Sequence, residues 1–310
     1  MTRKIFILVI GILLTACQVS PTFTPTIAPT NIPTLSPILT PTAIPTPIPT
    51  PTTIPFPKDY KQTFKVGEYN LTLECKGQGE PTIILEDGYA YKSWPSESLY
   101  RFTHLGRTCT YARPGTNGEK VTHLRTTQDQ VQDLHDLLTQ AGVPGPFILV
   151  GHSIAAFNIL MYTDQYPQDV VGLVCVDCRA PSFTSLVLEK YGPEQPDDPA
   201  GVKDTRKAFT QVSEDEYENI DFPTSQVQVM KVTSLGDRPF VVLLNPVAPW
   251  SDGSEKFDKL TNEAWNDASI ALSKLSSHSR LEIVQNCDHF SILYSSRVDF
   301  AVEEVYMEVK

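Results

Sequence analysis

One serine that directly follows a short apolar run is well placed for nucleophilic chemistry. The apolar run 146–150 ends in Gly151, His152 and Ser153, and a pattern typical of a helix begins at once. A buried strand that turns sharply into a helix would expose the Ser153 hydroxyl and place the backbone N–H of Ile154 at the helix start. Attack on a carbonyl needs both groups, because the hydroxyl oxygen attacks and the N–H stabilises the oxyanion that develops.

Small residues flank this serine, as a sharp turn of the backbone requires. Gly151 and Ala155 stand two residues before and after Ser153. The motif G-x-S-x-G carries glycine at both of these positions. The methyl group of Ala155 is expected to narrow the turn without abolishing it.

The segments around the serine alternate between strand and helix patterns. Strands are expected over residues 64–68, 70–76, 81–86, 107–112, 146–151, 170–176, 239–244 and 280–285. Helices are expected over residues 94–105, 126–141, 255–275 and 296–309, and directly after Ser153. Unalternated apolar runs such as 170–176 are typical of strands that are covered on both faces. The alternation predicts a mostly parallel sheet with helices on both faces, which is an α/β fold.

Composition and charge exclude some partners. The chain has 310 residues, 41% of them hydrophobic, a net charge of −11 and a pI near 5.0. The sequence contains no Lys/Arg cluster, so we expect no nucleic-acid partner. It also contains no metal-ligand spacing and no phosphate-binding glycine loop, so we expect no metal and no cofactor.

The first residues have the pattern of an export signal. Arg3 and Lys4 precede the apolar run 5–14, which is too short to span a bilayer as a stable helix. The tetrad that ends at Cys17 resembles the lipobox of bacterial lipoproteins, in which this cysteine is lipidated. We therefore predict a signal peptide over 1–17 and an exported protein that a lipid anchor holds at a membrane or the cell surface.

A Pro/Thr-rich segment follows over residues 18–57. It contains no charged residue, and proline recurs at every fourth position over much of its length. Such a segment cannot form a core and stays extended as polyproline II, so it is predicted to be a disordered stalk. The globular domain is then expected over 58–310.

Four landmarks in family order give residues 58–310 a resemblance to the α/β-hydrolase fold. They are Glu86-Asp87-Gly88, the turn from Tyr111 to Gly115, the Gly151-His152-Ser153 turn, and Asp288-His289 after the last strand. Ala112 stands where many members carry Asp, which affects no proposed catalytic role. The resemblance also implies that the polar insertion 179–237 forms a cap over the site.

The resemblance implies a triad in the chain order Ser, acid, His. His289 is the expected base, because it follows the final strand pattern. The acid has two candidates. Asp177 ends the strand 170–176 and is favoured, whereas Asp252 lies beyond the strand 239–244, after which most members place the acid.

The family geometry also implies an oxyanion hole and a reaction class. The donors would be the backbone N–H groups of Ile154 and Tyr89. A serine at the turn separates this chain from family branches that place Asp there. It points to acyl transfer to water from a small-molecule ester, thioester, lactone or amide.

In an exported protein, cysteines whose side chains lie close together are expected to form disulfide bonds. Cys75 and Cys109 would lie on neighbouring strands of the family's sheet, so a disulfide bond between them is expected. A second bond, between Cys178 and Cys287, would tie together the loops that carry Asp177 and His289. Cys175 would then stay buried and free.

Two functions from different classes are consistent with these patterns. The first is a surface-tethered serine hydrolase with a Ser-His-Asp triad. The alternative is a lipoprotein that uses the same fold only to bind a ligand or partner, because a fold does not itself give activity. The presence of Ser153 and His289, with a choice of two acids, favours the hydrolase.

Overall fold

The computed structural model describes residues 55–90, 94–212, 217–250 and 254–310. Cys17, the signal peptide 1–17, most of the stalk and Asp252 lie outside these residues. One compact unit spans Thr53–Lys310. Within the described ranges, no helix has both the length and the apolar character needed to cross a bilayer.

An eight-stranded sheet forms the centre of this unit, with the strand order β1-β2-β4-β3-β5-β6-β7-β8. The strands are β1 (Asp59–Val66), β2 (Tyr69–Lys76), β3 (Thr82–Glu86), β4 (Thr108–Tyr111), β5 (Phe147–His152), β6 (Val170–Val176), β7 (Phe240–Leu244) and β8 (Ser279–Ile283). β1 and β2 form an antiparallel hairpin, and β2 is antiparallel to β4. All pairs from β4 to β8 are parallel. The predicted mostly parallel sheet is confirmed.

Helices cover both faces of the sheet, and alternate strand residues belong to different layers. On β5, Leu149 belongs to the core cluster that contains residues of α2 (Thr127–Ala141), α3 (Ala155–Gln165) and α7 (Glu255–Ser273). Ile148 and Val150 belong to the opposite cluster, with residues of α8 (Ser296–Val309). β5 is therefore buried on both faces, as its unalternated apolar run predicts.

The predicted helix 126–141 is confirmed by α2. The predicted helix 94–105 is much longer than the helix that the structure has there. α2 begins with a capping box between Thr126 and Asp129 and ends at Gly142, whose φ of 66° suits glycine. Over 94–105, only α1 (Ser98–Arg101) is α-helical. Pro95 disfavours the helical conformation for the residue before it. In addition, Trp94 is held elsewhere, because its backbone N–H donates to Asp87 and its indole N–H to the Glu86 carbonyl.

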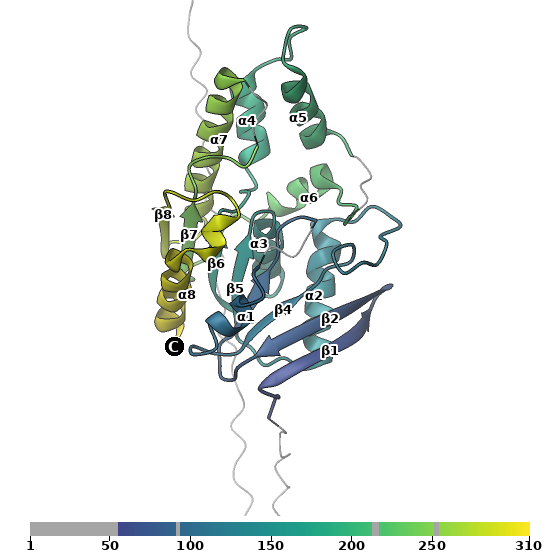
Figure 1. Ribbon diagram of the computed structural model, residues 1–310, viewed down its shortest axis with the longest axis vertical. Helices are drawn as coiled ribbons and strands as arrows, with labels where there is room; N and C mark the ends of the chain where they lie inside the picture. Colours follow the sequence, from purple (N-terminus) through teal and green to yellow (C-terminus); the bar gives the residue numbers. More distant parts are fainter. Residues whose placement is uncertain (1–54, 91–93, 213–216, 251–253) are drawn as a thin grey trace, which may run out of the picture. The chain divides into compact units, whose positions relative to one another are not determined.

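The described part of the polar insertion 179–237 contains three helices, which Figure 1 shows gathered at one end of the sheet. They are α4 (Phe183–Tyr191), α5 (Ala200–Thr210) and α6 (Phe222–Val229). α4 packs on α7, and α6 contacts α2, α3 and α5. Asp221 begins α6 by accepting a hydrogen bond from the Thr224 N–H at 2.9 Å. The sequence did not locate these helices.

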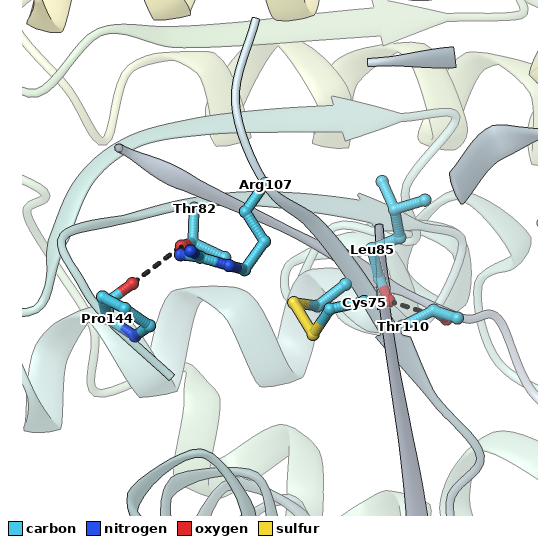
Figure 2. Close-up of a disulfide and its surroundings, with 7 residues drawn as sticks. Cys75, Thr82, Leu85, Arg107, Thr110 and Pro144 are labelled. Atoms are coloured by element: carbon cyan, nitrogen blue, oxygen red, sulfur yellow. Dashed lines mark hydrogen bonds between the residues drawn. A yellow bond between two sulfur atoms is a disulfide. The ribbon is translucent and has the colours of Figure 1, made fainter. Parts of the chain in front are cut away.

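A disulfide bond joins Cys75 on β2 to Cys109 on β4, as predicted. The two residues are directly paired in the antiparallel register, which brings their Cα atoms to 4.0 Å. Figure 2 shows this bond beside two hydrogen bonds of the neighbouring strands, from Thr110 to the Leu85 carbonyl and from Thr82 to the Pro144 carbonyl. The bond therefore staples the antiparallel hairpin to the parallel part of the sheet.

The second predicted disulfide was wrong, because Cys178 and Cys287 are free thiols. Cys178 is buried, and its thiol donates to the Gly151 carbonyl on β5. The Cys287 thiol instead donates to the Val284 carbonyl of its own loop. Each thiol is thus hydrogen-bonded to a different backbone carbonyl, and the two sulfur atoms are not bonded to each other. Cys175 is buried and free, as expected.

Candidate active site

Ser153 stands on a strained turn between β5 and α3. Its φ is 57°, a left-handed conformation that is uncommon for residues other than glycine. Its N–H donates to the Val176 carbonyl of β6 at 3.3 Å, which ties the turn to the neighbouring strand. A Cβ atom on Gly151 would lie 3.1 Å from Ile159 and 3.2 Å from Ala155. The first position of the motif therefore needs glycine, whereas the Ala155 methyl group is accommodated.

Asp177 directly follows β6 and is fully buried. Its Oδ2 accepts a hydrogen bond from Nδ1 of His289 at 2.7 Å. Its Oδ1 accepts from the Asn245 N–H at 3.0 Å and from the Trp265 indole at 3.3 Å. Burial raises the pKa of Asp177, although the hydrogen bonds from His289, Asn245 and Trp265 oppose that shift. Asp252, the alternative acid, lies outside the described residues.

His289 lies in the loop after β8 and is 7% exposed. It comes 112 residues after Asp177 in the sequence, and the parallel register of β6, β7 and β8 brings the two residues together. Because Nδ1 faces the carboxylate, the proton of a neutral imidazole belongs on Nδ1 in this geometry. The lone pair then belongs on Nε2, as a general base requires.

Ser153 and His289 line one cavity of about 190 Å³. The remaining lining residues are Gly88, Tyr89, His152, Pro249, Trp250 and Phe290. Ile154 is the N-cap residue of α3, so its N–H is not needed by the hydrogen bonds within that helix. Both predicted oxyanion residues are thus placed next to Ser153 or on the cavity wall. A larger and more open depression of about 920 Å³ between α4 and α7 is lined by no serine or histidine.

His152 supports the histidine loop, a role that sequence reasoning missed. Its Nε2–H donates to the His289 carbonyl at 2.8 Å, and the two rings lie 4.5 Å apart. Burial, and then the charge of His289, lower the pKa of His152 to about 3, so it is neutral near pH 7. The two residues are 137 positions apart, and no local pattern links them.

A buried ionic network beneath the Gly88 loop was also missed. Arg113 is 2% exposed and lies between two carboxylates, with Nη1 2.9 Å from Glu86 and Nε 2.6 Å from Glu218. Arg113 also donates to the Gly88 carbonyl, and Glu218 accepts the Ala90 N–H at 2.8 Å. Burial lowers the pKa of Arg113, but the two carboxylates outweigh this effect and raise it well above its usual range. Glu218 belongs to the insertion, so the network links the insertion to the loop that carries Tyr89.

No group of His, Cys, Asp and Glu side chains within the described ranges could hold a metal ion. A nucleophile, a base hydrogen-bonded to a buried carboxylate, and candidate oxyanion donors are the components of acyl transfer.

Comparison with known proteins identifies the family of this chain. A model of the alpha/beta hydrolase family matches residues 88–303. The chain belongs to the alpha/beta hydrolase family. The match extends from the Gly88 loop past His289, and it includes Ser153 and Asp177. The predicted family and fold are confirmed.

Individual relatives of this alpha/beta hydrolase are distant. "Uncharacterized protein YqjL" of Bacillus subtilis is 25% identical over 70% of this chain and 80% of its own length. "Probable transporter efuK" of Hormonema carpetanum is 31% identical over 38% of this chain, which spans only 18% of that protein. A thermophilic esterase from Thermogutta terrifontis superposes with a TM-score of 0.53 and 16% identity, covering 82% of this chain and 99% of its own. Its likeness shows the fold alone.

Proposed function

We propose that this alpha/beta hydrolase is a serine hydrolase that cleaves an ester or a related acyl bond. The observation that supports it most is the 2.7 Å contact between Asp177 and His289, beside a cavity that Ser153 and His289 both line. A buried carboxylate that fixes one ring nitrogen of a histidine is the arrangement that prepares a general base. The positive φ of Ser153 adds a second argument, because such strain is concentrated at functional sites.

In the acylation step, Ser153 Oγ attacks the substrate carbonyl carbon and its proton passes to Nε2 of His289. Asp177 keeps Nδ1–H in place and stabilises the imidazolium that forms. The N–H groups of Ile154 and Tyr89 stabilise the oxyanion of the tetrahedral intermediate. The C–O bond to the alcohol then breaks, and His289 returns the proton to the leaving oxygen.

In the deacylation step, a water molecule takes the place of the alcohol. His289 accepts a proton from this water as its oxygen attacks the acyl carbon bound to Ser153. The second tetrahedral intermediate collapses, the carboxylic acid leaves and Ser153 Oγ recovers its proton. No metal or cofactor takes part in either step of this proposal.

We further propose that the enzyme acts at a membrane or cell surface. The support is the sequence pattern 1–17, with its lipobox-like end at Cys17, and the uncharged stalk that follows. Several acyl chains on Cys17 would make release from a bilayer slow, since each buried CH₂ contributes about 0.8 kcal/mol. Mass spectrometry of the purified wild-type protein tests this part, and we expect its N-terminus to be a lipidated Cys17. Cytoplasmic protein that retains Met1 would contradict it.

A fluorophosphonate probe tests the hydrolase proposal directly, because it reacts only with an activated serine. We expect labelling of Ser153, with loss of both labelling and ester hydrolysis in Ser153→Ala. The loss in kcat should be at least about 10³-fold, because nucleophile and base act as a unit. Ser182→Ala is the matched control and should keep both properties. A Ser153→Ala variant with more than about a tenth of wild-type activity would refute the assignment.

A further inference from the structure

Arg179 is a buried cation that has no carboxylate partner among the described residues. It is 6% exposed, and within the described ranges its guanidinium has one hydrogen bond, from Nη2 to Thr184 Oγ1 at 2.7 Å. Its Nε is buried and has no hydrogen-bond partner in that part of the chain. Burial alone lowers the pKa of Arg179 to about 10, so the side chain stays charged at neutral pH. Arg113, which is buried to a similar degree, contacts two carboxylates instead.

Three aromatic rings surround the Arg179 guanidinium. Its central carbon lies 5.7 Å from the Phe157 ring, 4.9 Å from Phe209 and 5.5 Å from Phe222. Cation–π contacts recover part of the cost of burying the charge, but a ring face offers no acceptor in the plane of the guanidinium. Among the described residues the Nε–H therefore has no acceptor, and an anion that reached it would find a free donor on a buried charge.

The position of Arg179 connects it to the proposed active site. Its backbone N–H donates to the Ser153 carbonyl at 2.9 Å, and it follows Asp177 by two residues. Phe222 packs edge-on against Tyr89 with ring centres 5.2 Å apart. Tyr89 lines the cavity at Ser153, so one ring beside Arg179 also supports the cavity wall.

Phe209, another of the rings around Arg179, also contacts a residue that lines the cavity. Phe209 lies edge-on to Trp250, with ring centres 6.2 Å apart, and Trp250 lines the cavity. Two of the rings around Arg179, Phe209 and Phe222, thus pack against the cavity-lining residues Trp250 and Tyr89. A charge in apolar surroundings attracts an opposite charge more strongly than it would in water.

We propose that Arg179 selects substrates whose acyl chain carries a carboxylate at its far end, that is, monoesters of dicarboxylic acids. This inference rests on the proposed hydrolase function. The acyl chain stays attached to Ser153 in the acyl-enzyme, and Arg179 is anchored to the backbone of that same residue. The chain would pass between Phe209 and Phe222, where its carboxylate would accept the Nε–H and neutralise the buried charge.

A pair of chromogenic esters of equal chain length tests the proposal. p-Nitrophenyl hydrogen glutarate ends in a carboxylate where p-nitrophenyl valerate ends in a methyl group. We expect wild-type kcat/KM to favour the glutarate ester by about 10-fold or more, and this ratio to fall as ionic strength rises. Arg179→Met should lower the ratio by at least about 10-fold. Arg179→Lys should retain part of it, because the charge remains without the planar fork.

Arg206→Met is the matched control. Arg206 lies on α5 in the same insertion and also contacts an aromatic ring, but it has a carboxylate partner in Asp198 at 3.5 Å. Its loss should leave the glutarate-to-valerate ratio unchanged. A ratio near one in the wild type, or the same ratio in Arg179→Met, would overturn the proposal while hydrolysis of both esters leaves the proposed function standing.

A second measurement covers the case in which Arg179→Met fails to fold. Free glutarate should protect wild-type Ser153 from the fluorophosphonate probe, whereas valeramide at the same concentration should not. Equal or absent protection would overturn the anionic preference. Absence of labelling in unprotected wild-type enzyme would instead contradict the hydrolase function itself.

Discussion

The strand ends and the insertion 179–237 contribute to the same cavity by different means. At the strand ends, Ser153 and Asp177 are fixed by backbone hydrogen bonds to neighbouring strands, at 3.3 Å to Val176 and 2.7 Å to Leu243. The insertion also makes backbone hydrogen bonds, but what it adds to the cavity's surroundings is side chains, with Glu218 in a buried ionic network and aromatic rings around Arg179. Backbone hydrogen bonds between strands form whichever side chains the residues carry. Side-chain contacts, in contrast, change when the sequence changes. We infer that the strand ends supply the chemistry and the insertion supplies the choice of substrate.

The largest effect should come from the acid at the strand ends. We expect Asp177→Asn to lower kcat by about 10²-fold or more, because His289 loses the carboxylate that fixes its tautomer and stabilises its charge. Steady-state hydrolysis of a neutral ester gives this number. KM should change much less, since Asp177 contacts His289 and not the cavity.

Asp252→Asn is the matched control for this prediction, because the sequence leaves it as the alternative acid. It should retain wild-type kcat within about threefold. The reverse ranking, with a large loss in Asp252→Asn and a small one in Asp177→Asn, would move the acid to the segment after β7. It would also contradict the inference that Asp177, at the end of β6, supplies part of the chemistry.

The same difference explains what the sequence could predict. Apolar runs mark β5, β6 and β7 directly, and the carboxyl ends of parallel strands share one edge of the sheet. Ser153 and Asp177 directly follow two of those strands, so their place at this edge could be predicted without any knowledge of side-chain packing. The cysteine pair on β2 and β4 followed from the strand order that the resemblance to the α/β-hydrolase fold implies.

Side-chain direction within loops could not be predicted in this way. The expected bond between Cys178 and Cys287 failed because each thiol is directed toward a nearby carbonyl. The contacts of Glu218 with Arg113 span 105 residues, and no periodic pattern relates a loop glutamate to a distant arginine. Such contacts depend on packing, which only the folded chain determines.

A smaller effect is expected where the insertion meets the loop that carries Tyr89. In Glu218→Gln, Arg113 loses one of its two carboxylates and Ala90 loses a charged acceptor. We expect kcat to fall about 10-fold, because the proposed oxyanion donor at Tyr89 becomes less well positioned. Breaking a buried ion pair also costs about 3–5 kcal/mol of stability, so kinetics should be measured well below the Tm of the variant.

Asp221→Asn is the control for this effect, because it alters another carboxylate of the insertion without touching the Gly88 loop. Asp221 caps α6, and Asn is an equally good N-cap, so the variant should keep its stability within about 0.5 kcal/mol and leave kcat unchanged. An unchanged kcat in Glu218→Gln would mean that the insertion does not position the oxyanion donors. The insertion would then act on substrate choice alone.

The smallest expected effect on catalysis belongs to His152, whose consequence is instead a pH dependence of stability that arises at the strand ends. Burial, and then His289, lower the folded-state pKa of His152 from 6.5 to about 3. The unfolded chain therefore binds more protons than the folded protein between these values. The stability that neutral His152 contributes is fully present above pH 6.5 and is lost as the pH falls toward 3, by at most about 1.4 kcal/mol per pH unit. Denaturant titrations from pH 4 to pH 7 measure this slope.

His152→Gln should flatten it by up to one proton, whereas His278→Gln, at an exposed histidine, should not. A slope that is identical in wild type and His152→Gln would mean that acid acts on the insertion or the surface, and not on the contact between His152 and the His289 loop.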